Sequence, residues 1–288
     1  MMETVADLIA RVRPVPLMAL LEAGGTFAGG HRSPLIGQGI EFAGIRAYVP
    51  GDDVRAIDWK VTARRADPYV RVFTEDREMS LYIAVDCSAS GGYAGAGQKD
   101  RTIIDAAAAL VLGAESCGDR VGLCLFSDKM ENLIPARRGR RHVAVLLSAL
   151  RARMPFTGRT DLQAALGALA PSLPPLSTVL IISDFASPPF IKALKALRGK
   201  HRVVLLSVAD PHEQELPDLG LLSLEDIESG EQVIVDTSDP AVRQRFREAS
   251  VGRTHDLAMA AGECMTPLIP LTAGDDLGEA LIRARGWH

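Results

Sequence analysis

The pattern of apolar positions after residue 80 alternates between short continuous runs and longer segments with helical spacing. The continuous runs have the length of strands and cover residues 81–86, 121–126, 178–184 and 202–208. The segments expected to be helical cover residues 102–117, 142–153, 162–170 and 190–197. Continuous apolar strands separated by helices are typical of a mainly parallel sheet covered on both faces. We therefore predict a doubly wound α/β fold.

The last third of the chain continues with weaker signals. Short β runs are expected near residues 221–224 and 232–235, followed by a long helix that begins at Asp239-Pro240. An apolar run at 264–271 and a final helix from Asp275 complete the chain. We predict no specific role for the residues beyond about 210.

The first eighty residues differ from the rest of the chain in composition and pattern. A short helix is expected around Val15 to Ala23, and after it the chain is rich in Gly, Arg and Asp. Turns are signalled at Gly24-Gly25, at Gly29-Gly30 and at 50–53, which reads Pro-Gly-Asp-Asp. We predict two parts: an N-terminal segment, 1–79, with a short helix and short strands, and an α/β domain, 80–288.

Composition narrows the class of protein. The 288 residues include 47% hydrophobic and 24% charged side chains, which excludes a disordered or fibrous chain. The formal net charge of −4 argues against a surface built for nucleic acid. The basic run at 137–142 has no interleaved aromatic residues, so we interpret it as a solvated hairpin followed by the start of a helix.

Neither export nor membrane insertion is predicted. No apolar run reaches the roughly 18 residues that a membrane span needs. Glu3 and Asp7 precede the apolar part of the N-terminus, and Arg11 and Arg13 interrupt it, unlike an export signal. The four cysteines form no C-x-x-C pair and are expected to be free, buried thiols in a reducing compartment. We therefore expect a cytoplasmic protein.

Oxygen-bearing side chains follow two of the predicted strands. Asp86, Ser88 and Ser90 alternate after the first strand, so their side chains point to one side if the chain stays extended. Asp184 ends a later strand, and Thr160 lies in a loop between them. Ligands in such folds bind beyond the carboxyl ends of the strands. Oxygen ligands suit Mg²⁺ or Mn²⁺, and with only two carboxylates such an ion would attract a further acidic group.

These residues carry a resemblance to known families. The Asp-x-Ser-x-Ser pattern at 86–90, the Gly-Arg-Thr-Asp loop at 158–161 and Asp184 resemble the metal-ion-dependent adhesion site of von Willebrand factor A domains. The upstream stretch at 39–64 is similar to the signature of the bacterial family called domain of unknown function 58. The residues that carry this similarity are Gly39-Ile-Glu41-Phe42, Arg46-Ala-Tyr48-Val-Pro-Gly51-Asp52-Asp53-Val-Arg55-Ala-Ile-Asp58-Trp59-Lys60 and Ala63-Arg64.

The resemblance implies a fold, a metal and a partner. It implies a von Willebrand A-like domain in which Mg²⁺, Mn²⁺ or Ca²⁺ is held by Asp86, Ser88, Ser90, Thr160 and Asp184. It also implies an adaptor that works with a MoxR-type AAA+ ATPase and binds a client protein through an acidic side chain. Many relatives have Met after the second Ser, whereas this chain has Gly91-Gly92-Tyr93, which leaves the preference for a partner open.

Plainer interpretations stand beside this one. Thr160 with Gln163 fits a capping box, the two serines fit an ordinary turn, and Asp184 fits a turn former. The Arg/Asp-rich residues of the N-terminal segment fit an internal ion-pair network, which we favour, or a face that binds a partner. These residues are Arg46, Tyr48, Asp52, Asp53, Arg55, Asp58 and Trp59.

Two alternative functions remain open from the sequence. The first is a Mg²⁺-dependent phosphoryl-transfer or hydrolytic enzyme with Asp86 as nucleophile. Against it, Ser88 stands where Asp-x-Asp phosphotransferases have a second carboxylate. The second is a metal-free scaffold that docks through its N-terminal face. The chain has no phosphate-binding loop and no Gly-x-Ser-x-Gly elbow, so we predict no catalytic residue and a non-enzymatic role.

Overall fold

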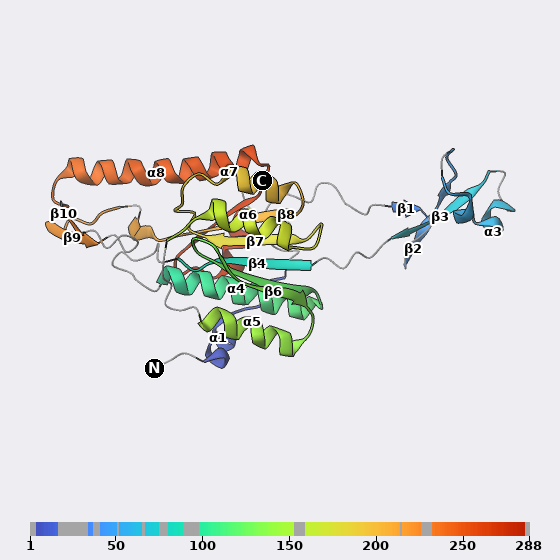
Figure 1. Ribbon diagram of the computed structural model, residues 1–288, viewed down its shortest axis with the longest axis horizontal. Helices are drawn as coiled ribbons and strands as arrows, with labels where there is room; N and C mark the ends of the chain where they lie inside the picture. Colours follow the sequence, from blue (N-terminus) through green and yellow to red (C-terminus); the bar gives the residue numbers. More distant parts are fainter. Residues whose placement is uncertain are drawn as a thin grey trace. The chain divides into compact units, whose positions relative to one another are not determined.

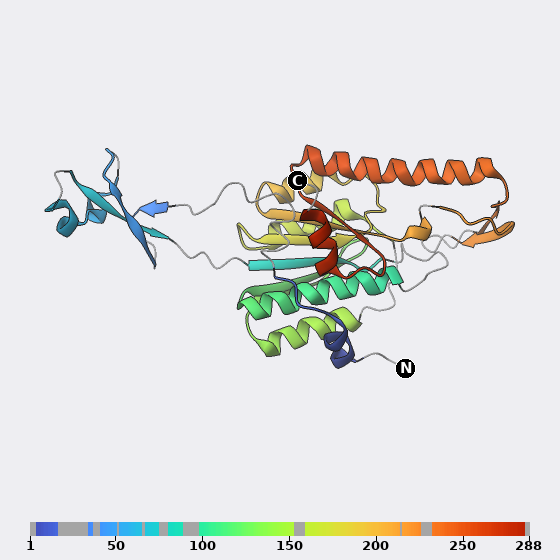
Figure 2. The same ribbon diagram turned by 180° about the vertical axis from the view of Figure 1, so that it is seen from behind.

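Two compact units make up the chain. A computed structural model describes residues 4–16, 34–36, 41–50, 52–64, 67–74, 80–88, 98–152, 159–213, 215–225 and 232–285. The larger unit comprises Met1–Thr26 and Met79–His288, and the smaller unit comprises Phe27–Glu78. The α/β elements and the short N-terminal strands can be followed in Figures 1 and 2.

A six-stranded sheet forms the centre of the larger unit. Its strands are β4 (Ser80–Asp86), β5 (Arg120–Phe126), β6 (Met130–Arg137), β7 (Thr178–Ser183), β8 (Arg202–Ala209) and β11 (Leu268–Thr272). They lie in the order β11-β8-β7-β4-β5-β6, and every neighbouring pair is parallel except β5 with β6. The prediction of a mainly parallel, doubly wound sheet is confirmed.

The antiparallel edge strand β6 was not predicted. Most of its side chains are exposed or half-buried, and nothing pairs with its outer edge among the described strands. Pro135 lacks a backbone N–H, and proline is tolerated on such an edge. The sequence of β6 therefore has neither the apolar run nor the regular alternation that marked the other strands.

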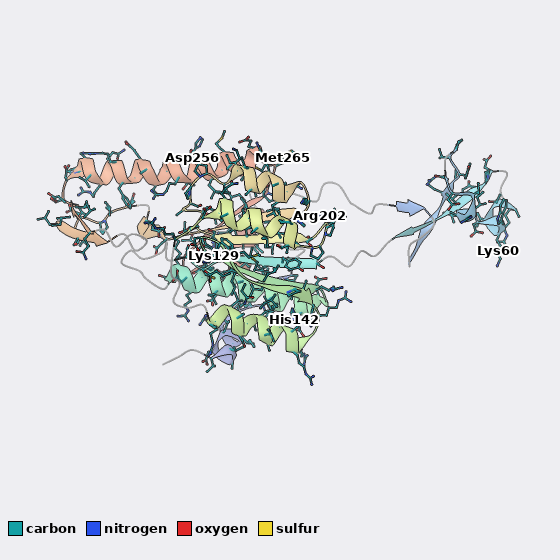
Figure 3. All side chains as sticks on the ribbon, in the orientation of Figure 1. Lys60, Lys129, His142, Arg202, Asp256 and Met265 are labelled. Atoms are coloured by element: carbon teal, nitrogen blue, oxygen red, sulfur yellow. The ribbon has the colours of Figure 1, made fainter. Side chains whose placement is uncertain are left out.

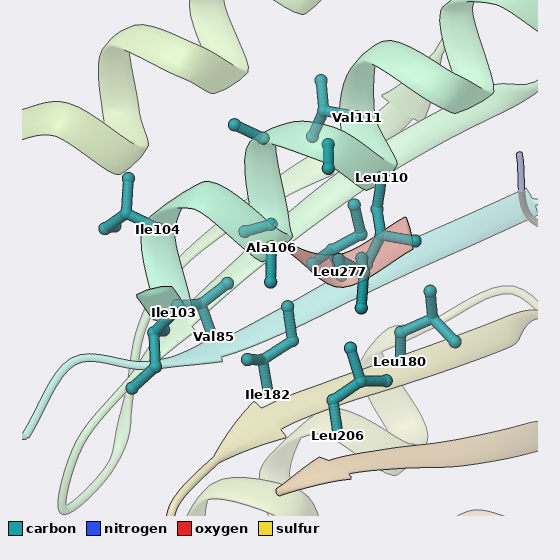
Figure 4. Packing of buried hydrophobic residues seen from close by; sticks show 14 of the residues in the cluster. Val85, Ile103, Ile104, Ala106, Leu110, Val111, Leu180, Ile182, Leu206 and Leu277 are labelled. Atoms are coloured by element: carbon teal, nitrogen blue, oxygen red, sulfur yellow. The ribbon is translucent and has the colours of Figure 1, made fainter. Parts of the chain in front are cut away.

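Side chains alternate between the two faces of the sheet. Leu81, Ile83 and Val85 of β4 point into one core, whereas Tyr82 and Ala84 point into the other. The first core is covered by α1 (Val5–Arg11), α4 (Gln98–Cys117), α5 (Arg140–Ala152) and α9 (Leu277–Arg285). The second is covered by α6 (Leu162–Ser172) and α7 (Ile191–Arg198). Figure 4 shows the first core, where Ile103, Ala106 and Leu110 of α4 lie over the sheet.

The N-terminus differs from its prediction. The helix is Val5–Arg11, capped by Thr4, rather than a helix around 15–23, and Val12–Pro16 is not helical. Residues 17–23 lie outside the described part of the chain. Leu8 and Val15 are buried in the core of the α/β unit, and the Val15 N–H donates to the Ala109 carbonyl at 3.0 Å. Residues 1–26 therefore group with the α/β domain, whereas we had expected them in a separate segment, 1–79.

One glycine makes this contact sterically feasible. A Cβ atom placed on Gly113 of α4 would lie 1.9 Å from the Val15 carbonyl oxygen. The N-terminal segment therefore crosses α4 where the helix has no side chain.

The smaller unit is an antiparallel sheet with two short helical turns. Its strands β1 (Pro34–Ile36), β2 (Glu41–Ala47) and β3 (Tyr69–Thr74) lie in the order β1-β3-β2. The turns are η1 (Val54–Ala56) and α3 (Trp59–Thr62). Its described core is small and consists of Ala56, Ile57 and Val70 with Tyr48 packed against them.

The C-terminal third adds a hairpin and a long helix. After η2 (Pro211–Glu213), strands β9 (Leu221–Glu225) and β10 (Gln232–Asp236) pair only with each other among the described strands. They lead into α8 (Pro240–Glu263), a 24-residue helix in which Ser250, Ala260 and Ala261 are the buried residues (Figure 1).

The helices and the cysteines bear on two further expectations. Within the described ranges, no helix is both long and apolar enough to cross a membrane. All four cysteines are free; three are buried, but Cys117 is exposed because it ends α4, so the expectation of four buried thiols was wrong for that residue.

Candidate functional site

The fold brings the ends of β4 and β7 together. These strands are neighbours, but the chain moves from β4 to β5 on one side and from β7 to β8 on the other. Such a switch in direction opens a crevice beyond the carboxyl ends of the two strands. Asp86 is the last residue of β4, and Asp184 directly follows β7. The two predicted carboxylates therefore occupy the switch point.

The Asp86 carboxylate is buried and surrounded by hydroxyl groups. Its Oδ1 accepts hydrogen bonds from the backbone N–H and the hydroxyl of Ser88, at 3.0 and 2.7 Å. Its Oδ2 accepts from the Ser183 hydroxyl at 2.6 Å. Ser183 was not among the predicted site residues, although its place at the end of a strand beside Asp184 was a usable signal.

Thr160 joins this cluster rather than capping a helix. Its hydroxyl donates to the Ser88 Oγ at 2.5 Å, across 72 residues of sequence. The residue that caps α6 is Asp161, whose Oδ1 accepts from the Ala164 N–H at 2.9 Å. The capping-box interpretation of Thr160 with Gln163 is therefore wrong, because Gln163 instead accepts from the Ala193 N–H.

The surroundings of Asp86 disfavour its ionised form. Burial, and after it the negative charge of Asp184, raise the pKa of Asp86 to about 6, although the hydrogen bonds from Ser183 and Ser88 act to lower it. Bringing a positive charge to this carboxylate would relieve both effects.

Asp184 has a cationic partner that the sequence did not reveal. The Lys99 Nζ lies 2.6 Å from the Asp184 Oδ2 and 2.8 Å from the Glu213 Oε1. Burial alone would lower the pKa of Lys99, but the charges of Asp184 and Glu213 outweigh it and the pKa is raised. A lysine in the first turn of a helix is usually exposed, so no signal in the sequence marked Lys99 as part of this site.

Asp184 also has the structural role that was considered for it. Its Oδ1 accepts from the Ala186 N–H at 3.0 Å, as in a turn that a side chain stabilises. The residue therefore both shapes the loop after β7 and carries charge at the switch point.

The donor chemistry of the cluster fits a hard divalent cation. Asp86, Ser88 and Thr160 converge through oxygen atoms alone, whereas Asp184 is shared with Lys99. Ser90 lies outside the described residues. Within the described ranges, no group of three or more His, Cys, Asp or Glu side chains forms a metal cluster, so hydroxyl groups would have to complete the coordination.

The predicted partner-binding residues of the smaller unit are mostly used internally. Arg46 donates to Asp52 at 2.8 Å, and Asp52 also accepts from the Val49 N–H at 2.9 Å. Asp53 caps η1 and Asp58 caps α3. These contacts support the structural interpretation that we favoured.

Three other predicted residues of that unit differ in burial. Tyr48 packs against the small core. Trp59 is 69% exposed, and Arg55 is exposed as well. Trp59 therefore presents an aromatic side chain at the surface of the smaller unit.

Comparisons with known proteins give a family and several relatives. The family model described as "Protein of unknown function DUF58" matches residues 44–256. The uncharacterized protein Rv1480 of Mycobacterium tuberculosis is 35% identical over 281 residues, which cover 96% of this chain and 88% of that protein.

Solved structures are more distant. An aerotolerance-related membrane protein from Bacteroides fragilis is 17% identical, with a TM-score of 0.46, covering 73% of this chain and all of the other. A von Willebrand factor type A protein from Catenulispora acidiphila is 13% identical, with a TM-score of 0.39, covering 75% of this chain and 43% of the other.

Proposed function

The chain belongs to the DUF58 family, and on that premise we propose that it is a non-enzymatic protein-binding module whose contact with a partner depends on a divalent metal ion. The observation that carries this proposal is the convergence of Asp86, Ser88 and Thr160 at the switch point of the sheet. A buried carboxylate surrounded by hydroxyl groups is suited to hold Mg²⁺, or Mn²⁺ or Ca²⁺ in its place.

Each residue has a distinct part in the proposed site. Asp86 supplies the charge, Ser88 and Thr160 supply neutral oxygen ligands, and Ser90 would add a third hydroxyl. Ser183 orients the Asp86 carboxylate through its 2.6 Å hydrogen bond. Asp184 contributes charge that Lys99 partly neutralises. When bound, the ion supplies a coordination position for an Asp or Glu side chain of the partner.

The proposed partners rest on the family resemblance. We propose a MoxR-type AAA+ ATPase and a client protein with an acidic side chain, which meet this chain in the cytoplasm. In that role the module would act as an adaptor in assembling or maturing another complex.

The alternative of an enzyme that uses Asp86 as nucleophile has less support. Ser88 stands where Asp-x-Asp phosphotransferases have a second carboxylate. Both oxygens of Asp86 accept hydrogen bonds from hydroxyl groups, an arrangement that suits a metal ligand as well as a nucleophile. Turnover of a generic phosphoester with Mg²⁺, lost in Asp86→Asn, would restore this alternative.

Calorimetry tests the proposal. Chelator-treated protein is titrated with Mg²⁺ and with Mn²⁺, with and without a short acidic peptide. We expect saturable binding that the peptide tightens, that Asp86→Ala and Thr160→Val abolish, and that Thr160→Ser retains because it keeps the hydroxyl.

Asp161→Asn is the matched control, since it changes a neighbouring carboxylate that caps α6 instead of facing the cluster. Binding that survives Asp86→Ala, or binding of the peptide in the presence of chelator, would contradict the proposal.

A second candidate, the metal-free scaffold, is supported by the surface of the smaller unit. Val49, Val54 and Trp59 are 56%, 60% and 69% exposed there. In this case Trp59→Ser and Arg55→Glu would remove binding of the partner ATPase, while Asp86→Ala would leave it unchanged.

A further inference from the structure

The stretch that holds the β9–β10 hairpin is strongly acidic. Residues 221–239, which include the hairpin, contain six Asp and Glu residues and no Lys or Arg. The helix α8 that follows contains three acidic residues and four arginines, so its net charge of only +1 leaves most of the acidic charge uncompensated. Two of these arginines form ion pairs on the surface, Arg243 with Asp218 and Arg247 with Glu215, and such exposed pairs bind weakly.

Apolar side chains stand exposed on this hairpin. Leu221 pairs with Asp236 and Ser223 pairs with Ile234, so Leu221 and Ile234 lie on the same face. They are 72% and 75% exposed. A two-stranded hairpin gains little stability by itself, and exposed apolar residues on it typically mark an interaction surface.

Positively charged side chains gather at the other end of the α/β unit, where the strand β6 ends. Because β6 runs antiparallel to β5, its carboxyl end lies at the edge away from the ends of β4, β7 and β8. Exposed arginines follow there at 137, 138, 140 and 141. Val145, one helical turn after Arg141 on α5, is 54% exposed.

The figures agree with this placement. Figure 1 shows the β9–β10 hairpin at the end of the α/β unit where α8 begins, and Figure 3 labels His142, next to these arginines, at the start of α5 away from the hairpin.

We propose that the β9–β10 hairpin of one molecule binds the Arg137–Val145 surface of a second copy. The hairpin offers two apolar side chains among acidic residues, and the second surface offers an apolar side chain beside four arginines. The hairpin lies beyond the carboxyl ends of β4, β7 and β8, and the Arg137–Val145 surface lies toward their amino ends, so a molecule cannot satisfy both by itself. The contact is therefore head-to-tail, and an assembly that does not close into a ring keeps one free surface of each kind at its ends.

The association is measured on the full chain by sedimentation velocity. We expect a weight-average mass above 30.8 kDa that rises with concentration at about 50 mM salt. At about 500 mM salt the association constant should fall by about tenfold or more, because salt screens the charges.

Two variants separate the surfaces. Leu221→Ser with Ile234→Ser disables the hairpin, and Arg140→Glu with Arg141→Glu disables the basic surface. Each variant alone should remain monomeric. An equimolar mixture should form dimers and stop there, because one variant keeps only its basic surface and the other keeps only its hairpin.

Met259→Ala is the matched control, since Met259 is 61% exposed on α8 and belongs to neither surface. Circular dichroism and thermal unfolding show that each variant is folded. A wild-type chain that stays monomeric at all concentrations at low salt would overturn the proposal. Self-association that both double variants retain, or a mixture that forms no dimer, would overturn it equally.

Discussion

The Lys99 ammonium lies 2.6 Å from the Asp184 carboxylate, and both side chains are almost completely buried. The site thus contains a cation of its own, which balances Asp184 and Glu213 but does not contact Asp86 through any ion pair within the described residues. Of the two carboxylates at the switch point, Asp86 is therefore the one whose charge a bound ion would neutralise.

Replacing Lys99 should destabilise the fold strongly. Lys99→Met leaves the buried Asp184 and the neighbouring Glu213 without their cation, so we expect a loss of about 3 kcal/mol in the free energy of unfolding. Lys195→Met is the matched control, because Lys195 and Glu263 form an exposed pair and its loss should cost at most about 1 kcal/mol. Urea unfolding measures both, and equal losses would contradict the burial of Lys99.

The stability of the metal-free protein should depend on pH through Asp86. The folded-state pKa of about 6 lies above the ordinary value of 3.8, so the folded state binds the proton more tightly than the unfolded state. The stabilisation by this proton is complete below about pH 4 and is lost as the pH rises through about 6, by roughly 3 kcal/mol.

Comparison with Asp86→Asn isolates that contribution. Burial also raises the pKa of Asp100, which adds to the slope in both proteins, so the difference between the two curves is the quantity to follow. The difference in unfolding free energy should widen between about pH 4 and 6 and remain constant above that range. Parallel curves over the whole range would show that Asp86 titrates normally.

If Asp86 holds the metal, affinity for Mg²⁺ should fall in acid. An ionised carboxylate is the ligand, and protons compete for it below the pKa of about 6. We expect the affinity to fall about fivefold between about pH 6 and 5, with little change above about pH 7. Calorimetry across this range gives the profile, and an affinity independent of pH would place the ion elsewhere.

Gly113 should tolerate no side chain. Gly113→Ala sets a Cβ 1.9 Å from the Val15 carbonyl oxygen and should lift residues 12–16 away from α4, at a cost of at least about 2 kcal/mol. Hydrogen exchange at the Val15 amide, which is bonded to Ala109, should accelerate.

Gly252→Ala supplies the control for that substitution. Gly252 lies in α8, where a Cβ would meet no atom within 4 Å, so alanine should stabilise the helix by up to about 1 kcal/mol. Unchanged stability and exchange in Gly113→Ala would show that the N-terminal segment does not cross α4 as described.

The residues at the strand ends show which parts of the candidate site could be predicted from the sequence. Asp86 and Asp184 each followed an apolar run, and parallel strands bring such ends to one edge, so their proximity was predictable. The contact of Thr160 with Ser88 followed from the resemblance to an adhesion site but not from spacing alone. Lys99 was not predictable, because only the tertiary fold places it between two carboxylates that are 29 residues apart in sequence.

The crossing of α4 by the N-terminal segment determines how this protein can be divided. The smaller unit, Phe27–Glu78, is an insertion in the sequence of the α/β unit, whose first helix precedes it. Truncation at the boundary near residue 79 would remove Leu8 and Val15 from the core and uncover α4 at Gly113. Excision of residues 27–78 with a short linker between Thr26 and Met79 keeps every contributor to that core on one chain. We therefore expect the α/β unit to tolerate internal deletion of residues 27–78 better than truncation from the N-terminus.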